Sequence, residues 1–265
     1  MLTDVGRVRK IDEDSIMSMD LSFAVDSKNS EFRLLIVADG MGGHAKGEEA
    51  SRMALLAISR TVLSGLFEDV PFTDLLKRGI ENANRDVLGY VDENPESAGM
   101  GTTAVCALVR GNEVYLANIG DSRIYVVSEE EIRRVTRDHS YVQELVDAGS
   151  ITEKESRIHP KKNIITKAIG AAETAEPDAS RLTLDSDESL LLCCDGVTAH
   201  LEDNDIQKIV RRSGDPQAAC KDIVDTANER GGTDNISLIL LSPSGEDGVP
   251  SGEDDVPTTI KGGSA

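Results

Sequence analysis

FRLLIVADGMGGH, residues 32–44, joins an apolar run to an acid and a cluster of glycines. The apolar run at 32–38 has the length and composition of a buried strand. It ends in Asp39, and three glycines follow within four positions. A carboxylate at the end of a rigid strand is well placed to hold a cation, and an adjacent glycine lets a main-chain carbonyl approach the same ion. Asp-Gly is also a common turn, so this segment alone leaves both interpretations open.

Recurrence of the pattern favours the metal site. Asp195 follows the apolar run LLLCC at 190–194, and Asp234 precedes the strand-like run at 236–241. Asp121 lies in the turn NIGDSR at 118–123. Four aspartates at boundaries between strands and loops indicate a site for hard cations built from oxygen ligands.

Charge and composition restrict the class of protein. The chain has 265 residues, enough to bury a sizeable core, and its 48 acids against 28 bases give a net charge of -20. Nucleic acid and anionic membranes repel such a protein, so we expect neither as a partner. The N-terminus shows no signal peptide and no apolar run reaches membrane-spanning length. We therefore expect a cytoplasmic protein.

The cysteines do not resemble a metal or disulfide framework. The four cysteines form no CxxC pair, and two of them, Cys193 and Cys194, are adjacent in a strand-like run. Adjacent residues of a strand point to opposite faces of the sheet. We interpret all four as buried thiols in a reducing compartment, not as zinc ligands or disulfides.

Periodicity predicts strands interleaved with pairs of helices. Strands are expected at 15–25, 32–38, 101–110, 113–119, 123–127, 132–135, 180–184, 189–194 and 236–241. Helices are expected at 45–66, 71–95, 203–212 and 216–230. The segment 138–178 has weaker periodicity, with a helix expected at 140–148 and a short helix or turn at 152–157. We predict that this segment is a flap over the site. This order of elements indicates a layered α+β domain.

Eight segments carry a family resemblance. They are TDVGRVRKIDEDS (3–15), VADGMGGHAKGEEAS (37–51), GTTAV (101–105), NIGDSRIY (118–125), RDHSYVQELVDAG (137–149), HPKKNIITKAIG (159–170), LLCCDGV (191–197) and GGTDNISLIL (231–240). In this order they strongly resemble the metal-dependent protein phosphatases of the 2C type, the PPM family, in their short bacterial or archaeal form.

The resemblance implies a fold and an activity. The fold would be a four-layer α-β-β-α sandwich, with two central antiparallel sheets flanked by helix pairs. The catalytic domain would be residues 1–242, followed by an acidic Gly/Ser/Pro tail at 243–265 that composition predicts to be disordered. The activity would be hydrolysis of phosphoserine and phosphothreonine in proteins. We expect a monomer whose substrates are phosphorylated by a Ser/Thr kinase of the same cell.

The resemblance also implies a cofactor and a set of ligands. Two tightly bound Mn²⁺ or Mg²⁺ ions would share a bridging hydroxide that attacks phosphorus in line, and a third ion would bind more weakly. The implied metal ligands are Glu13, Asp14, Asp39, Gly40, Asp121, Asp195 and Asp234. Asp39 would bridge the two tight ions, and Asp121 would hold the third ion together with Asp195.

Several assignments stay open. Arg9 resembles the family's phosphate-binding arginine, although a basic cluster followed by acids is also typical of a salt-bridged surface turn. His44 is either a general acid or a structural histidine, and Asp121 could simply cap its turn. Asp12 stands where relatives usually have Asn, with an effect that the sequence does not define. The rival functions are a catalytically silent binding module of the same fold and a hydrolase of small phosphate esters or nucleotides.

Overall fold

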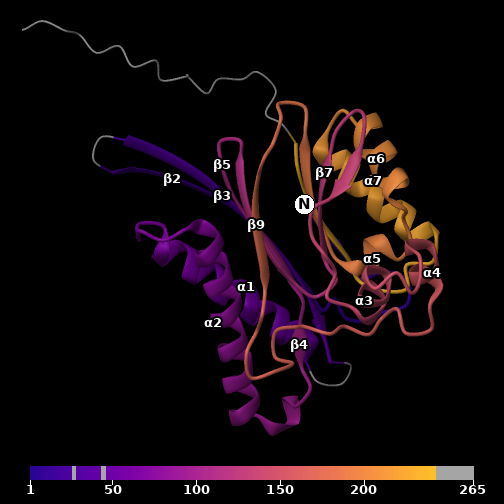
Figure 1. Cartoon of the computed structure of the whole chain (residues 1–265), viewed down its shortest axis with the longest axis horizontal. Coiled ribbons are helices and arrows are strands. Elements are labelled where there is room, and N and C mark those ends of the chain that lie inside the picture. Colours follow the sequence, from indigo (N-terminus) through magenta and orange to yellow (C-terminus); the bar gives the residue numbers. More distant parts are fainter. Residues whose placement is uncertain (26–27, 43–45, 243–265) are drawn as a thin grey trace, which may run out of the picture.

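The computed structural model describes residues 1–25, 28–42 and 46–242, and two antiparallel sheets form its centre (Figure 1). The first sheet has the order β2 (Asp14–Val25), β3 (Lys28–Met41), β5 (Ala104–Arg110), β6 (Glu113–Ile119) and β9 (Asp178–Thr183), with β4 (Gly101–Thr102) paired to β3. The second has the order β1 (Leu2–Asp4), β11 (Ile236–Leu241), β10 (Ser189–Cys193), β7 (Arg123–Val127) and β8 (Ile132–Arg134).

Helices cover the outer face of each sheet. On the first sheet lie α1 (Gly47–Gly65) and α2 (Phe72–Glu93), and on the second lie α6 (Asp203–Arg212) and α7 (Pro216–Glu229) (Figure 1). Shorter helices are η1 (Pro95–Ser97), α3 (Tyr141–Asp147), α4 (Glu153–Ile158) and α5 (Asp195–Thr198). The predicted four-layer α-β-β-α arrangement is confirmed.

Three apolar layers separate these four layers. Strand β3 shows how one segment serves two of them: Leu34 and Ile36 pack under α1 and α2, whereas Leu35 and Val37 pack between the sheets. Because side chains alternate along a strand and both faces of β3 are buried, the strand is continuously apolar, without alternation. This explains why the run at 32–38 was recognisable in the sequence.

The predicted strand at 101–110 is wrong in one detail. It is interrupted at Thr103, between β4 and β5. Thr103 donates its backbone N–H to the carbonyl oxygen of Asp39 at 2.9 Å, and its hydroxyl bonds that of Ser122 at 2.7 Å. The chain therefore leaves the regular ladder where it holds the residues around Asp39.

Three elements were missed by the sequence analysis: β1, α5 and the three-residue helix η1. Strand β1 has three residues, too few for a periodic pattern, and its Leu2 pairs with Leu238 from the other end of the chain. Helix α5 has four residues and begins at Asp195. Within the described ranges, no helix has both the length and the apolar character needed to cross a membrane. The tail at 243–265 lies outside the described residues.

Candidate metal centre

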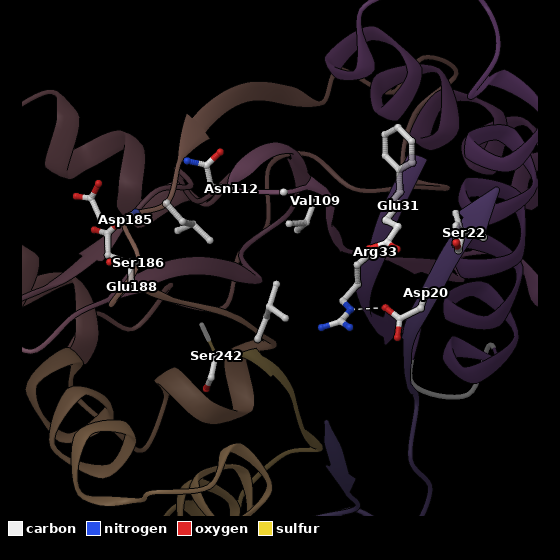
Figure 2. Close-up of a pocket in the computed structure, with 15 residues that line it drawn as sticks. Asp20, Ser22, Glu31, Arg33, Val109, Asn112, Asp185, Ser186, Glu188 and Ser242 are labelled. Carbon is white, nitrogen blue, oxygen red and sulfur yellow. Dashed lines mark hydrogen bonds and ion pairs between the residues drawn. The ribbon is translucent and has the colours of Figure 1, made fainter. Parts of the chain in front are cut away.

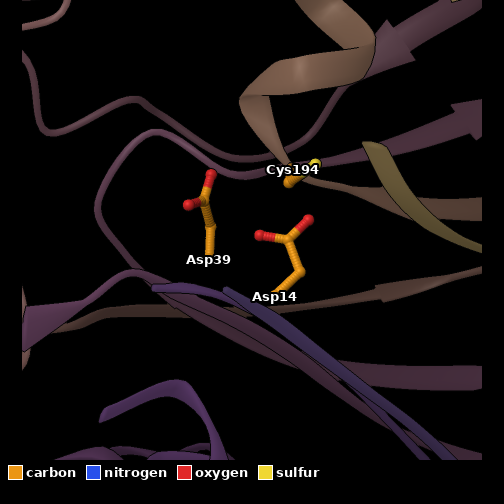
Figure 3. Close-up of side chains that lie close together, drawn as sticks. All are labelled: Asp14, Asp39 and Cys194. Carbon is orange, nitrogen blue, oxygen red and sulfur yellow. The ribbon is translucent and has the colours of Figure 1, made fainter. Parts of the chain in front are cut away.

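Strand pairing brings the first two predicted ligands together. Asp14 begins β2 and lies directly opposite Asp39 near the end of β3. Figure 3 shows both carboxylates pointing into the same space, with Cys194 beside them. One carboxylate oxygen from each aspartate and the Cys194 sulfur lie within 4.8 Å of one another. The register of β2 on β3 therefore creates this pair of acids.

The backbone of Asp39 is held by Thr102 of β4 and by Thr103, which follows it. Its carbonyl oxygen accepts hydrogen bonds from the Thr102 hydroxyl at 2.8 Å and from the Thr103 N–H at 2.9 Å. Its own N–H donates to the Thr103 hydroxyl at 3.3 Å. Because both backbone groups are bonded, the position of the Asp39 backbone is fixed before any ligand arrives.

Gly40 lies where only a glycine fits. A Cβ at this position would lie 2.3 Å from the carbonyl oxygens of Glu13 and Gly47, closer than atoms can approach. Its N–H donates to the Glu13 carbonyl at 3.1 Å. Close packing against the chain before β2 thus explains the glycine after Asp39.

Three further aspartates reach the same region from the other elements. Asp121 lies in the turn between β6 and β7, Asp195 begins α5, and Asp234 lies between α7 and β11. Burial is the main cause that raises the pKa of Asp39, and the carboxylates of Asp14, Asp195, Asp121 and Asp234 raise it further. We call these five aspartates, Asp14, Asp39, Asp121, Asp195 and Asp234, the acidic centre.

Burial and mutual repulsion disfavour the charged forms in the acidic centre. Burial is the larger cause, and it raises the pKa of Asp14 to about 7 and that of Asp121 to about 8. Burial, followed by the neighbouring carboxylates, raises the pKa of Asp39 well above its usual range and also raises that of Asp195. Four buried acids of this kind, Asp14, Asp39, Asp121 and Asp195, are expected to need a compensating cation.

Unsatisfied oxygens indicate where that cation belongs. Both carboxylate oxygens of Asp14 and the Oδ1 atom of Asp121 are buried, and none has a hydrogen-bond partner among the described residues. A buried carboxylate without partners is strongly destabilising. Oxygen ligands suit Mg²⁺ and Mn²⁺, so the residues present fit the ions that the sequence predicted.

This arrangement predicts a pH-dependent response to metal. The folded protein without metal keeps Asp14 protonated up to about pH 7, whereas the unfolded chain releases that proton near 3.8. Stability without metal should therefore fall as the pH rises between these values and stay low above them. Since a bound cation removes the repulsion, Mg²⁺ should raise the melting temperature by roughly 5 °C more at about pH 8 than at about pH 5. Differential scanning fluorimetry at both pH values checks this, and an Mg²⁺ effect independent of pH would contradict it.

Arg9 lies at the solvent side of the acidic centre. Its Nη2 atom is 2.8 Å from Oδ2 of Asp234, and its Nη1 atom is 3.5 Å from Oε2 of Glu13. The Arg9 side chain is 43% exposed, so its remaining donors can reach a molecule arriving from solvent. The salt-bridged turn and the functional arginine, which the sequence left as alternatives, are compatible in this geometry.

Asn235 fixes the loop that carries Arg9, a contribution that the sequence analysis missed. Its side-chain amide donates to the carbonyl oxygens of Val5 at 3.1 Å and Ile11 at 2.9 Å. Its side-chain oxygen accepts the Glu13 N–H at 2.9 Å. An asparagine next to the predicted ligand Asp234 was the only signal in the sequence. Val5 and Ile11 lie more than 220 positions away along the chain, so no local pattern marks these contacts.

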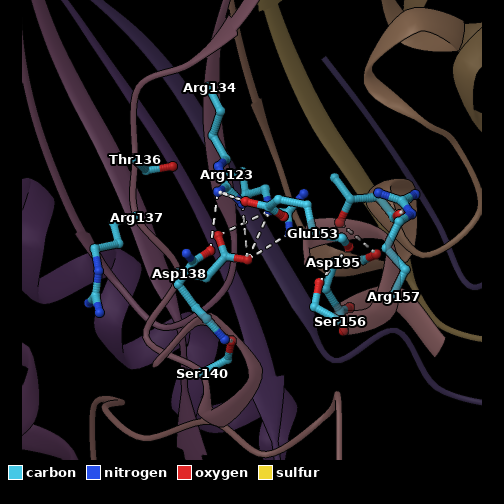
Figure 4. Close-up of polar contacts among 12 residues, drawn as sticks. Arg123, Arg134, Thr136, Arg137, Asp138, Ser140, Glu153, Ser156, Arg157 and Asp195 are labelled. Atoms are coloured by element: carbon cyan, nitrogen blue, oxygen red, sulfur yellow. Dashed lines mark hydrogen bonds and ion pairs between the residues drawn. The ribbon is translucent and has the colours of Figure 1, made fainter. Parts of the chain in front are cut away.

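A largely buried ion-pair network around Asp138 borders the acidic centre (Figure 4), and Arg123 and Asp138 line the same small cavity as Asp121 and Asp195. Arg123 donates from Nε and Nη2 to the Asp138 carboxylate at 3.0 and 2.6 Å. Arg134 lies 3.6 Å from the same carboxylate and 3.0 Å from Glu153 of α4. The network therefore ties the turn at Asp121 to the segment predicted as a flap.

That segment also shares a small cavity with the acidic centre. The cavity has a volume of about 90 Å³, and its lining includes Asp121 and Asp195 together with Ser140, Ser156 and Lys162. Residues 138–178 thus lie beside the Asp121 side of the site. His44 lies outside the described residues, so its two interpretations stay open.

A larger cavity than this one lies elsewhere. It has a volume of about 630 Å³ and includes Asp20 and Arg33, which form an ion pair (Figure 2). This pair lies six positions along the β2–β3 ladder from Asp14 and Asp39. None of the predicted site residues lines this cavity. The predicted site and this cavity therefore lie at different ends of the β2–β3 ladder.

Comparisons with known proteins agree with this geometry. A family model described as "Protein phosphatase 2C" matches residues 19–234. The chain is 33% identical over 241 residues to the "Serine/threonine phosphatase stp" of Listeria monocytogenes, covering 90% of this chain and 93% of the relative.

Solved structures are similar as well. Serine/threonine phosphatase Stp1 from Staphylococcus aureus has a TM-score of 0.82 at 36% identity, covering 92% of this chain and 94% of that one. The catalytic domain of the serine/threonine protein phosphatase PstP, solved in complex with two manganese ions, has a TM-score of 0.74 at 30% identity, covering 91% of this chain and 95% of that one.

Proposed function

The chain belongs to the protein phosphatase 2C family of metal-dependent serine/threonine protein phosphatases, and on that basis we propose that the acidic centre is its catalytic site. The observation that supports this most is the set of buried carboxylate oxygens without hydrogen-bond partners on Asp14 and Asp121. The substrates are phosphoserine and phosphothreonine side chains of proteins, phosphorylated by a Ser/Thr kinase of the same cell. We further propose that residues 1–242 form the catalytic domain and that it acts as a monomer.

The proposed ligands divide between two tight ions and one weaker ion. Asp39, the Gly40 carbonyl, Asp195 and Asp234 would hold the first ion, and Asp39 would also reach the second. Asp14 and Glu13 would bind the second ion through its waters, and Asp121 with Asp195 would hold the third. When bound, Mn²⁺ or Mg²⁺ would supply a water activated for in-line attack on phosphorus and would neutralise phosphate oxygens.

Arg9 would bind the substrate phosphate. Its planar guanidinium suits two parallel hydrogen bonds to phosphate oxygens. The ion pair with Asp234 orients the guanidinium from one side, and the bonds made by Asn235 hold the loop on which it lies. Arg9 would thereby present a fixed positive group at the mouth of an otherwise acidic site.

Phosphate release from a phosphothreonine peptide tests the proposed function. We expect a chelator to abolish release and added Mn²⁺ or Mg²⁺ to restore it, because the proposed ligands are oxygens. Nucleotides and small phosphate esters serve as comparison substrates, since an activated aryl phosphate does not separate the two classes of hydrolase. Release that persists in chelator, or that only Zn²⁺ restores, would contradict the proposal.

Replacing Arg9 should weaken substrate binding more than metal binding. Arg9→Ala is expected to raise KM by roughly ten- to a hundredfold, which corresponds to about 1.5–3 kcal/mol of lost charge-assisted hydrogen bonding. Part of the loss appears in kcat if the guanidinium binds the transition state better than the substrate. Steady-state kinetics and calorimetric Mn²⁺ titration measure both properties.

Two variants are informative controls for Arg9→Ala. Arg9→Lys keeps the charge but not the planar fork, and should give an intermediate KM. Asp121→Ala should keep the two tight ions and lose turnover mainly in kcat. An unchanged KM in Arg9→Ala would show that Arg9 only stabilises its turn and does not bind the substrate phosphate.

A further inference from the structure

Cys194 lies at the acidic centre although its chemistry differs from that of the other ligands. It directly follows β10 and precedes Asp195 of α5. The two adjacent cysteines point to opposite faces, as predicted: Cys193 packs in the core under α6 and α7, and Cys194 between the two sheets. Cys194 therefore faces Asp14 and Asp39 on the first sheet (Figure 3).

The sulfur is held in place by the backbone of the second sheet. Its Sγ atom accepts the Ser237 N–H at 3.1 Å and donates to the Asn235 carbonyl at 3.4 Å. Cys194 is fully buried. Fixed in this way, the sulfur is presented to the two aspartates as a third potential ligand.

Asp14, whose unsatisfied oxygens also support the proposed catalytic site, indicates that a ligand binds at this position. Both of its carboxylate oxygens are buried and have no hydrogen-bond partner among the described residues. One of them lies within 4.8 Å of both the Cys194 sulfur and an Asp39 oxygen. The unsatisfied carboxylate, and not the cysteine alone, marks this as a cation site.

Ligand softness determines which cation the three atoms would select. Sulfur ligands favour zinc and other thiophilic ions, whereas Mg²⁺ and Mn²⁺ prefer oxygen. At zinc–sulfur bonds of about 2.3 Å and zinc–oxygen bonds of about 2.0–2.2 Å, ligand atoms lie roughly 3.5 Å apart, so an ion would draw these side chains together by about 1 Å. No hydrogen bond among the described residues holds the Asp14 carboxylate, so rotation of that side chain can supply most of this shift toward the held sulfur.

We propose that Asp14, Asp39 and Cys194 form a site for a thiophilic divalent cation, Cd²⁺ or Zn²⁺, and that occupation of this site excludes Mn²⁺ from Asp39. On binding, a metal–sulfur bond forms and the thiol proton passes to the buffer, without oxidation or reduction. The site thus revises the interpretation of all four cysteines as mere buried thiols. The exclusion of Mn²⁺ rests on the proposed function, whereas the thiophilic site itself does not.

Titration of the metal-free full chain with Cd²⁺ tests the site directly. We expect the ultraviolet charge-transfer band of a cadmium–thiolate bond to rise and saturate near one equivalent. Cys194→Ser should lose the band, whereas Cys193→Ser should retain it, because Cys193 is equally buried but faces the other core. Cys220→Ser is a second control from that same core, and melting curves establish that each variant is folded.

The absorption results separate the alternatives. A band that survives in Cys194→Ser, that disappears in folded Cys193→Ser or Cys220→Ser, or that is absent in the unaltered protein would overturn the proposal. Because the absorption band does not depend on hydrolysis, it tests the thiophilic site even if the protein proves inactive on phosphothreonine peptides.

Competition kinetics test the exclusion of Mn²⁺. Relative to each variant's own Mn²⁺-supported rate, Cys194→Ser should need at least about tenfold more Cd²⁺ for half-inhibition, equivalent to about 1.4 kcal/mol. Cys193→Ser should match the unaltered protein. Equal Cd²⁺ sensitivity of Cys194→Ser and the unaltered protein would show that Cd²⁺ inhibits at another site. That result would overturn the proposed exclusion of Mn²⁺ from Asp39.

Discussion

Asp39→Asn is expected to lower kcat by at least about a thousandfold, equivalent to about 4 kcal/mol of transition-state stabilisation. The amide has the same shape as the carboxylate, and the backbone bonds of Asp39 to Thr102 and Thr103 can all be retained. What is lost is the charge that is proposed to be shared by two ions. Calorimetric titration should accordingly show loss of tight Mn²⁺ binding.

The same variant should become more stable when metal is absent. The carboxylates of Asp14 and Asp195 lie close enough to raise the pKa of Asp39, after the larger effect of its burial. A neutral amide removes this repulsion, so the metal-free melting temperature should rise while the Mn²⁺-dependent increase disappears. This opposite response distinguishes loss of a metal ligand from general damage to the fold.

Asp20→Asn is the matched control for Asp39→Asn. Asp20 lies six positions from Asp14 on β2, is exposed, and pairs with Arg33 at the other end of the ladder. Its substitution should leave kcat and Mn²⁺ affinity unchanged, because exposed ion pairs contribute little. If Asp39→Asn retained ordinary Mn²⁺ affinity and rate, the proposed bridging role would be wrong.

The aspartates at the ends of β3 and β10 could be predicted because these strands are buried on both faces and are therefore apolar throughout. Strand β3 packs Leu34 against helices and Leu35 against the other sheet, so its sequence is apolar throughout and its end at Asp39 is abrupt. Likewise, β10 is buried along its whole length before Asp195. A sharp change from apolar to acidic is a local signal, and the sequence displays it without any tertiary information.

What the sequence left undetermined depends on contacts between distant residues. Alternation predicts that Cys193 and Cys194 point to opposite faces, but both faces of β10 are buried, so the pattern does not tell which cysteine faces Asp14. The partners of Asn235 are similarly remote. The roles of individual aspartates came from the family resemblance, since spacing alone indicates oxygen ligands but not which ion each one binds.

The ion-pair network of Arg123, Asp138 and Arg134 has no local signal in the sequence. Its disruption is the second large effect that we expect. Asp138→Ala should reduce the free energy of unfolding by about 3–5 kcal/mol, because the Arg123 and Arg134 guanidiniums would lose their shared buried partner. The Asp138 side chain is only 7% exposed and that of Arg123 only 17%. Water can therefore replace little of the lost interaction.

A double-mutant cycle determines whether this loss belongs to the ion pair. Urea denaturation of Asp138→Ala, Arg123→Met and the double variant should give a coupling energy of at least about 1 kcal/mol, because the second substitution removes the charge that the first leaves unpaired. Arg137→Ala is the matched control from the same segment: its ion pair with Asp147 is 48% and 40% exposed and should cost less than about 1 kcal/mol. If Asp138→Ala cost no more than Arg137→Ala, the turn at Asp121 would have to be held by other contacts. Its bond from the Gly120 N–H to the His139 ring at 3.2 Å would then be the next candidate.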